Sequence, residues 1–483
     1  MTERKVFAGQ RVKHLRTALG LNQATMAREL GISGSYLNLV ERNQRPLTTQ
    51  LVLKLAETYD LDLRDLRGDR ETRRVAELTE ILTDPAFGKM PPPAAIADIV
   101  NGYPDIAAAL VSIYGAYRKT SAAGQLLPDS AASDDRQPVS RDERFPVEEV
   151  RDYFHARNNY IASLDDEAET FHAELAENDD LFPALRQYLR DQHQVRVTVL
   201  PIHAMPDAQR RFDRHNRRLF LSEMLSVPSR TFQVAVQVAL LSYGKEIDRL
   251  VADAKLSGED ANRLFRIGLA NHFAGALMMP YERFLEAATA TRYDIDVLAN
   301  RFGASIEQVA HRLTTLQRSE RRGVPFFLLR LDNAGNISKR FSAGGFAFAR
   351  FGGTCPRWRV HDAFATPGET IVQPVELPDG TRYLTISRTV EAMRGRYPLN
   401  TRKLAISLGC EISHAAQTIY ADGLDLTGAE TATPIGVTCR VCERTNCAAR
   451  AFPPMTRPLT IDASRKGFSA FEFGEIVRRD RPA

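Results

Sequence analysis

The sequence predicts a multidomain chain that is mainly α-helical, with α+β structure toward its C-terminal end. Its 483 residues correspond to about three domains at roughly 100–200 residues per domain. Apolar residues recur mostly at helical spacing as far as Leu313, whereas after Gly323 they alternate as they do in strands. The composition, 43% hydrophobic and 26% charged, is that of a globular protein with a sizeable core. A largely disordered chain is therefore excluded.

The predicted domain boundaries follow changes in composition and periodicity. A basic head is followed by amphipathic helices that either form a dimer contact or pack within their own domain. A stretch rich in Ser, Ala, Asp, Gly and Pro then predicts a flexible linker. The predicted segments are a head over 1–70, a helical connector over 71–120, a linker over 121–144, a middle domain over 145–320 and a C-terminal domain over 321–483.

The positive charge is concentrated at the start of the chain. The first 59 residues hold nine Lys or Arg and four Asp or Glu, a balance of +5, so the remaining residues sum to −1 of the total of +4. A basic segment on a neutral body is typical of binding to a polyanion. There is no run of 18 apolar residues and no apolar segment after Met1, so the sequence predicts a cytoplasmic protein without a membrane span.

Four short helices are predicted in the head. Apolar spacing places them at 12–19, 23–30, 34–42 and around 51–59. A tight turn at Gly31 separates the second helix from the third, and Ser33 is the expected N-cap of the third helix. This is the helix-turn-helix pattern, in which the second helix of the pair enters a DNA major groove.

The head resembles the phage-repressor (XRE-type) helix-turn-helix family. The matching residues are Gln23, Ala27, Gly31, Tyr36, Leu37 and Glu41. The resemblance implies Gln23 on a phosphate, Ser33, Ser35, Tyr36 and Asn38 at base edges, and Arg42, Asn43 and Arg45 on the DNA backbone. Arg16 and Glu41 match a structural ion pair of that family.

A helical protein-docking module is the alternative for the head, and the positive charge favours double-stranded DNA over it. One helix-turn-helix unit reads few base pairs, so specific binding normally needs two copies about one DNA turn apart. The sequence therefore predicts a homodimer or a higher homo-oligomer.

In the middle domain, helices are predicted from Phe145 to Asn159 and over 165–177, 230–251 and 259–278, with strands over 195–200 and 218–221. This layout, with the segment 270–280, resembles the ImmA/IrrE zinc-peptidase domain. A working peptidase of that type carries His-Glu-x-x-His, whereas residues 236–240 here read Val-Gln-Val-Ala-Leu and no histidine of the chain precedes a glutamate. The sequence predicts a zincin-like domain that lacks its zinc motif and has no catalytic residue. A metallopeptidase-type anti-repressor is the weaker alternative.

Five arginines lie within nine positions of the middle domain. Guanidinium groups suit phosphate oxygens, so the cluster is a candidate site for an anionic effector. The alternatives are a solvated basic strand edge and a second DNA contact. The residues are Arg210, Arg211, Arg214, Arg217 and Arg218.

The C-terminal domain is predicted to be α+β, after a short capped helix over 304–313. The expected strands are 326–332, 337–341, 369–375, 381–387 and 403–408.

Five cysteines, all beyond residue 354, form a candidate metal site near the end of the chain. Cys439, Cys442 and Cys447 give C-x2-C-x4-C, and thiolates at this spacing can share one metal. Cys355, in a loop, suits the fourth position better than Cys410, which follows an apolar strand. The spacing favours an iron–sulfur cluster, 4Fe–4S, over zinc, and the third interpretation is that all five are ordinary reduced thiols.

The order of the domains and the tail Pro434–Pro454 resemble the short-chain fatty acyl-CoA regulator family, the group of RamB-like and propionyl-CoA carboxylase regulators. The resemblance covers nearly the whole chain. It implies a transcription factor of acetate or propionate metabolism that responds to a short-chain acyl-CoA. A redox or iron–sulfur sensing transcription factor is the alternative, and it depends on the cysteines alone.

Overall fold

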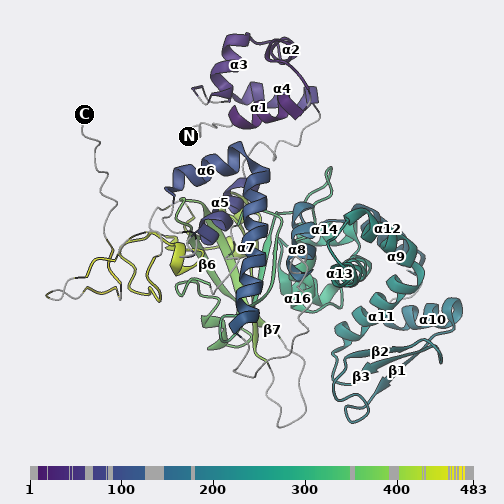
Figure 1. Cartoon of the computed structure of the whole chain (residues 1–483). Coiled ribbons are helices and arrows are strands. Elements are labelled where there is room, and N and C mark those ends of the chain that lie inside the picture. The colour runs from purple at the N-terminus through teal and green to yellow at the C-terminus, as the bar shows by residue number, and fades with distance from the viewer. Residues whose placement is uncertain are drawn as a thin grey trace, which may run out of the picture.

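The structure is a computed structural model of the whole chain (Figure 1). It describes residues 9–59, 69–125, 146–175, 180–348, 354–390, 402–454 and 457–473, with gaps inside these ranges at 19, 43, 46, 83, 85–86, 88–90, 347, 427, 429–430, 458, 462–463, 465–466 and 470.

The head is the small helical bundle at the top of Figure 1. Its four helices confirm the four predicted from the sequence: α1 (Gly9–Ala18), α2 (Gln23–Glu29), α3 (Gly34–Glu41) and α4 (Thr49–Tyr59). They enclose a core of their own, built around the buried side chains of Val12, Met26, Leu37 and Leu55.

Three helices follow the head: α5 (Asp69–Leu82), α6 (Pro93–Gly102) and α7 (Pro104–Gln125). They share a small core that includes Leu78, Ile96 and Val100. Helix α7 continues through Gln125, past the predicted start of the linker at residue 121. Residues 126–144 of that predicted linker lie outside the described residues.

The middle domain packs nine helices of the described chain around a small sheet. The helices are α8 (Pro146–Ala156), α9 (Ala162–Leu175), α10 (Leu181–His193), α11 (Val227–Ser242), α12 (Gly244–Ala254), α13 (Glu259–Met278), α14 (Tyr281–Ala290), α15 (Ile295–Arg301) and α16 (Ile306–Leu313). The sheet has the order β1-β3-β2, with β1 (Arg196–Leu200) parallel to β3 (Arg218–Ser222) and β2 (Arg210–Asp213) antiparallel to it.

One predicted helix of this domain is two helices. The apolar pattern predicts a single helix over 230–251, but the chain breaks between Ser242 and Gly244 into α11 and α12. Glycine weakens a helix by about 1 kcal/mol relative to alanine, and the break allows α12 to turn away from α11. The boundaries of α13, in contrast, are those predicted.

The C-terminal domain contains a six-stranded sheet in the order β5-β4-β8-β7-β6-β9. The strands are β4 (Phe327–Asp332), β5 (Ile337–Ser342), β6 (Ile371–Glu376), β7 (Arg382–Val390), β8 (Leu404–Glu411) and β9 (Thr433–Pro434). All neighbours are antiparallel except β6 and β9. The remaining short elements are η2 (Asp362–Phe364), α17 (Ile412–Ala415), η3 (Ile419–Ala421) and η4 (Cys439–Val441).

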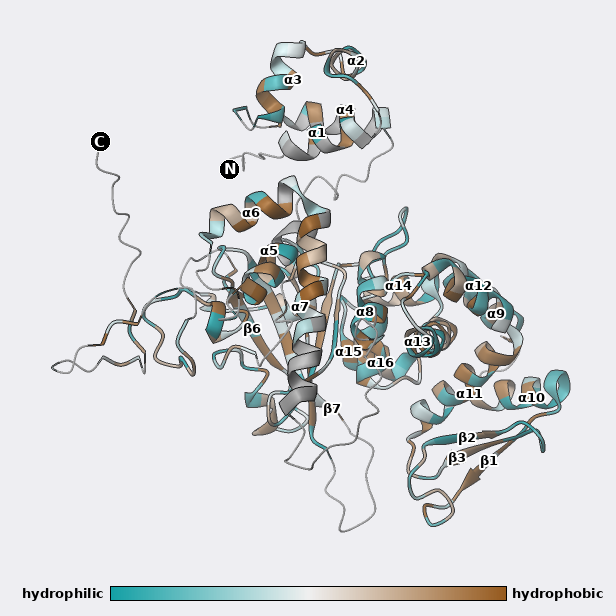
Figure 2. Cartoon of the chain, viewed as in Figure 1, coloured by the Kyte–Doolittle hydropathy of each residue, from teal (hydrophilic) through white to brown (hydrophobic). Residues whose placement is uncertain are grey.

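The middle and C-terminal domains share a hydrophobic core. Side chains of α14, α15 and α16 pack with Leu328 of β4, Ile386 of β7 and Ile406 of β8 in one continuous cluster. Figure 2 shows the strands near the labels β6 and β7 largely in the brown of apolar residues. Because this core crosses the predicted boundary at residue 320, the two domains form one packed body.

Candidate functional site

The head places its second and third helices as a helix-turn-helix pair. Asn22 caps α2 by accepting a hydrogen bond from Thr25 N at 2.8 Å, and Ser33 caps α3 by accepting one from Tyr36 N at 3.1 Å. Gly31, between the helices, has φ +60°, which is the left-handed region that glycine adopts at no steric cost. Gly31 therefore allows the turn between α2 and α3, and Ser33 starts α3 as a separate, capped helix.

A partly buried ion pair ties α1 to α3. Arg16 donates to both carboxylate oxygens of Glu41, at 2.7 and 3.1 Å, which confirms the predicted pair. The hydrogen bonds from Arg16 and the desolvation of its guanidinium group act in opposite directions, and the net effect raises the arginine pKa. Gln23 donates to the same carboxylate at 3.0 Å, so in this structure its amide serves the scaffold. Its predicted contact with a phosphate stays a prediction.

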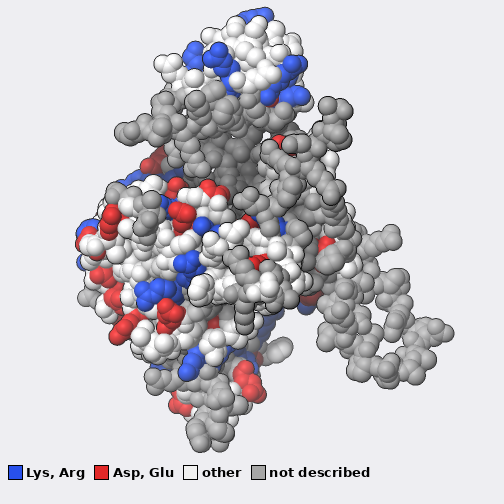
Figure 3. Space-filling view, turned by 90° about the vertical axis from the view of Figure 1, so that its left-hand side faces the viewer, with Lys and Arg blue, Asp and Glu red and all other residues white. Residues whose placement is uncertain are grey.

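The other predicted DNA-contacting residues belong to α3 and to the segment after it, and Tyr36 also packs against the core of the head. Ser35, Arg42 and Arg45 are exposed, while Tyr36 and Asn38 are half-buried. Asn43 lies outside the described residues. Lys and Arg side chains gather on the head in Figure 3. Ser33 is both the cap of α3 and a predicted base contact, and its hydroxyl accepts one hydrogen bond of the helix terminus.

A large cavity lies where the middle domain meets the β4–β5 hairpin of the C-terminal domain. Its volume is about 830 Å³, and α8, α11, α13, α16 and the hairpin supply its walls. Three cationic side chains, those of Arg151, Lys339 and Arg340, line it together with aromatic rings. The aromatic residues are Phe154, Phe232 and Phe341. The cavity thus combines an apolar surface with positive charge.

The charges around this cavity are organised by two carboxylates. Glu148 of α8 lies between two guanidinium groups, 3.6 Å from Arg151 and 3.8 Å from Arg340. Glu307 of α16 accepts from Lys339 at 2.6 Å and from Arg330 at 2.7 Å. Burial would raise the pKa of Glu307, but these two cations hold it below its usual range. Both carboxylates connect the middle domain to the hairpin.

A second cavity of about 240 Å³ adjoins the first, and Phe232, His272, His311 and Lys339 line both. Desolvation lowers the pKa of His311 to about 3, so its imidazole is neutral at pH 7. The ring packs edge-on against Phe341, with 4.5 Å between the ring centroids. His311 therefore contributes an uncharged surface to both cavities.

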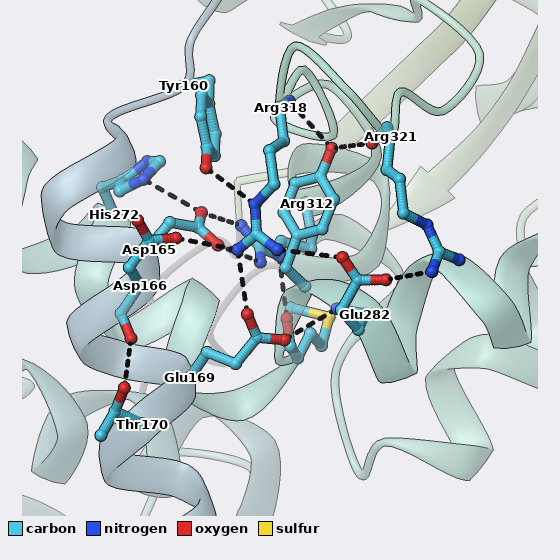
Figure 4. A network of polar contacts seen from close by, with 12 residues as sticks. Tyr160, Asp165, Asp166, Glu169, Thr170, His272, Glu282, Arg312, Arg318 and Arg321 are labelled. Carbon is cyan, nitrogen blue, oxygen red and sulfur yellow. Dashed lines mark hydrogen bonds and ion pairs between the residues drawn. The ribbon is translucent and has the colours of Figure 1, made fainter.

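A buried ion pair lies beside the second cavity, which Arg312 lines (Figure 4). Arg312 of α16 donates to the two oxygens of Asp165 of α9 at 2.6 and 2.8 Å, and the arginine also donates to the carbonyl of Met279. Burial alone would raise the pKa of Asp165, but the Arg312 guanidinium holds it well below its usual range. His272 lies 3.4 Å from the same carboxylate.

A second arginine extends this network. Arg318 donates to Tyr160, Asp166, Glu169 and Glu282, at distances from 2.9 to 3.2 Å (Figure 4). Arg312 therefore joins α16 to α9, and Arg318 joins the segment after α16 to α9 and α14.

The predicted arginine cluster lies elsewhere, on the β2–β3 hairpin. None of its five members lines the 830 Å³ cavity. Arg210 and Arg211 are neighbours on one strand and point to opposite faces of it. Arg211 stacks on Phe220, with 5.2 Å to the ring centroid, and Arg217 donates to Gln194. The structure therefore does not bring the five side chains together around that cavity.

Sequence reasoning missed Arg151, Lys339 and Arg340 because they come from elements far apart in the chain. Arg151 reads as one polar position of an amphipathic helix, and the two strand residues read as ordinary polar positions of a hairpin. Only the packing of α8 against β5 brings them to one cavity.

Four of the five cysteines line one small cavity near the end of the chain. Cys355, Cys439, Cys442 and Cys447 surround it, whereas Cys410 lies on β8 in the shared core. The structure thus groups Cys355, and not Cys410, with the three neighbouring cysteines. Burial raises the pKa of Cys355, and nearby Cys439 and Cys442 raise it further. In the described part of the chain, no three His, Cys, Asp or Glu side chains already stand in a metal-binding arrangement.

Arg450 holds the backbone of this cysteine loop. Its guanidinium donates to the carbonyls of Cys439, Cys442 and Arg444 at 2.7 to 3.0 Å. Gly436 approaches so closely that an added Cβ would lie 2.8 Å from the sulfur of Cys442. The loop is therefore shaped by its own contacts, and the absence of a side chain at Gly436 leaves room for the Cys442 thiol.

Three known families match the chain in succession. A helix-turn-helix family matches residues 12–66, the IrrE N-terminal-like domain matches residues 190–314, and the C-terminal domain of short-chain fatty acyl coenzyme A regulators matches residues 315–471.

Relatives match over nearly the full length. The transcriptional regulator RamB of Mycobacterium tuberculosis (strain H37Rv) is 41% identical, over 97% of this chain and 98% of the relative. The propionyl-CoA carboxylase regulator of Cereibacter sphaeroides is 41% identical, over 97% and 99%. PrpR of M. tuberculosis is 38% identical, over 95% and 94%.

A solved Mycobacterium tuberculosis transcriptional regulator is similar in structure, with a TM-score of 0.65 and 41% identity. The match covers 68% of this chain and 99% of the other. Within the described residues, no helix is long and apolar enough to cross a membrane. The relatives are named as regulators, which opposes the metallopeptidase alternative.

Proposed function

The chain belongs to the family of helix-turn-helix regulators of short-chain fatty acyl-CoA metabolism, and from this we propose that its effector is a short-chain acyl-CoA that binds in the 830 Å³ cavity. The protein is a transcriptional regulator and not an enzyme. The observation that carries the proposal is the convergence of three cations and three aromatic rings on one cavity between two domains.

The cavity suits the chemistry of such a ligand. Its volume lies within the range of about 300–1,000 Å³ that is usual for small-molecule sites. Arginine forks bind phosphate oxygens bidentately, so Arg151 and Arg340 are the proposed phosphate contacts, with Lys339 beside them. The rings of Phe154, Phe232 and Phe341 offer the apolar surface for the acyl group or the base.

The effector would act by linkage. A ligand that binds one arrangement of the body better than another shifts DNA affinity by its differential binding, typically about 1–3 kcal/mol. The cavity is the proposed place for this coupling, because its wall α8 comes first after the predicted linker that leads back to the head. We also propose that the heads act as a homodimer on two half-sites.

Calorimetric titration with acetyl-CoA, propionyl-CoA and free CoA tests the site. R151A/R340A is expected to weaken acyl-CoA binding about 10- to 100-fold, because a hydrogen bond between charged groups contributes about 1.5–3 kcal/mol. R211A/R214A, on the β2–β3 hairpin, is the matched control and is expected to bind like the wild type. Loss of binding in the control but not in R151A/R340A would move the effector to the hairpin, and no binding of any CoA by the wild type would refute the effector.

The four grouped cysteines support a second proposal, that Cys355, Cys439, Cys442 and Cys447 hold a 4Fe–4S cluster, with zinc as the alternative metal. Four thiols around one cavity are the donor set that such a cluster takes. The cluster would supply a redox-sensitive link between the loop of Cys355 and the tail. If DNA binding followed this cluster and ignored acyl-CoA, the protein would be a redox sensor.

An absorption spectrum and metal analysis of protein purified without oxygen test the cysteine site. C439S and C442S are expected to lose the visible absorption and the metal, while C410S, the buried control on β8, is expected to retain both. Colourless wild-type protein that contains zinc would select zinc, and protein without either metal would refute the metal site.

A further inference from the structure

Helix α7 carries an exposed apolar stripe beside the one that packs into the connector. Tyr103, directly before the helix, is 63% exposed, Ile106 is 53%, Ile113 is 65% and Tyr117 is 47% exposed. Leu110 lies at the centre of the series; it is half-buried and also packs against the core of the connector. Successive members are three and four residues apart, which is the spacing of the contact positions in paired helices.

The connector itself uses a different row of the same helix. Ala107 and Tyr114 are buried, and the hydroxyl of Tyr114 donates to Asp84 at 2.7 Å. Helices α5 and α6 cover this row. A surface helix needs one apolar face toward its core, and Leu110 itself packs partly against that core. The four exposed members of the stripe, at 103, 106, 113 and 117, are surplus to the fold of the connector.

The stripe is its own complement. Read from either end, its residues are Tyr, Ile, Leu, Ile and Tyr, with Leu110 at the centre. If a second α7 lies antiparallel across Leu110, then Tyr103 faces Tyr117 of the second copy and Ile106 faces Ile113 of the second copy. A two-fold interface requires a surface that is complementary to itself, and a different partner would not require it.

We propose that α7 is a dimerisation helix, which pairs antiparallel with α7 of a second copy of this chain about a two-fold axis at Leu110. This deepens the proposed function, since it rests on the proposal that the heads act in pairs. The antiparallel helices place one tyrosine pair at each end and the isoleucine and leucine side chains between them, with the tyrosine hydroxyls at the wet rim.

The size of the stripe sets the strength of the contact. Half-exposed aromatic and aliphatic side chains of this number cover roughly 400 Å² per copy, against the about 800 Å² per partner of a standard interface. The dimer is therefore weak in solution and is completed when both heads bind adjacent half-sites. Dimerisation is then observed as cooperative binding to DNA and, in the absence of DNA, as self-association that depends on protein concentration.

Sedimentation velocity of the full chain over a wide concentration range, with footprinting on an operator and on the same operator cut to one half-site, tests the proposal. I106E/I113E places like charges opposite one another, so the dimer dissociation constant is expected to rise at least tenfold. Cooperative binding to the paired site is expected to disappear, while binding to one half-site is unchanged. I106K/I113E places opposite charges across the same contact and is expected to restore dimerisation.

V227E/I267E is the matched control. Val227 and Ile267 are 66% and 50% exposed and lie on other helices, so this variant is expected to dimerise like the wild type. A wild type that stays monomeric, or an I106E/I113E variant that dimerises normally, overturns the proposal. Failure of I106K/I113E to recover overturns the antiparallel register. Loss of all DNA binding by the wild type would instead refute the proposed function, because the association measurement needs no operator.

Discussion

At the scale of single residues, the ion pairs Arg16–Glu41 and Asp165–Arg312 differ in how readily the sequence predicts them. Arg16 and Glu41 both lie in the helix-turn-helix pattern, so their pairing follows from the resemblance. Asp165 and Arg312 are separated by 147 positions, and nothing in the local pattern of either marks it as a partner. Their pairing depends on how α16 packs on α9, which periodicity does not specify.

The buried pair predicts a pH-dependent variant. R312M leaves the Asp165 carboxylate buried without its main counter-charge and is expected to lower the free energy of unfolding by about 3–5 kcal/mol at pH 7. In the wild type the depressed pKa of Asp165 gives stability that is present above its unfolded pKa of about 3.9 and is lost as the pH falls through the lower, folded value.

In R312M, burial is expected to raise that pKa above the unfolded value, so the variant should recover stability as the pH is lowered from 7 to 5. Urea denaturation at the two pH values measures this. D165N/R312M, which removes the carboxylate, is the control. An equal deficit of R312M at both pH values would contradict this account.

At the scale of elements, predictions succeed where the signal is local. The third helix of the head begins at its predicted Ser33 cap, and α13 has its predicted boundaries. The single helix predicted over 230–251 is wrong because the apolar pattern continues through Gly244, although the backbone does not. The helices α14 and α15 are not predicted, and their length does not explain this, since α14 has ten residues whereas the predicted α2 and α3 have seven and eight.

Two substitutions in α3 and its cap are expected to separate the stability of the head from its recognition of DNA. S33A is expected to reduce the stability of the head by about 1 kcal/mol, since Tyr36 N loses its side-chain acceptor. N38A is expected to leave stability within about 0.5 kcal/mol and to abolish the specific footprint. Thermal unfolding and footprinting of the two variants measure both effects. If N38A kept the wild-type footprint, α3 would not be the recognition helix as predicted.

At the scale of the whole molecule, the hydrophobic cores of the described residues differ in whether they stay within one domain or join two. The head has its own core, whereas the middle and C-terminal domains are joined through β4, β7 and β8. The sequence predicts separate domains on either side of residue 320 because the period changes there. The spacing of apolar residues shows where helices give way to strands, but it does not show that the helices and strands pack into one core.

Calorimetry is therefore expected to show a small transition for the head and one larger transition for the joined body. A saturating acyl-CoA should raise only the larger transition, by about 2.7 kcal/mol of stability at 100 times its dissociation constant. I406A, a truncation in the shared core, is expected to lower the same transition by about 2–5 kcal/mol and to leave the head unchanged. Separate transitions for the middle and C-terminal domains would contradict a shared core.

The apolar residues of α11 have a consequence for timing. Val236 and Leu240 lie on α11, where the sequence predicts that a peptidase of this layout would carry its zinc-binding histidines. A regulator that is not an enzyme would release the proposed effector chemically unchanged. The occupancy of the site then depends only on the concentration of the effector and on its affinity. After the effector concentration falls, the protein responds with a delay set by the residence time of the bound ligand. For an association rate of about 10⁶ M⁻¹s⁻¹, micromolar affinity corresponds to residence of about a second, whereas nanomolar affinity would extend it to many minutes. A regulator that does not consume its signal gains speed by binding it weakly.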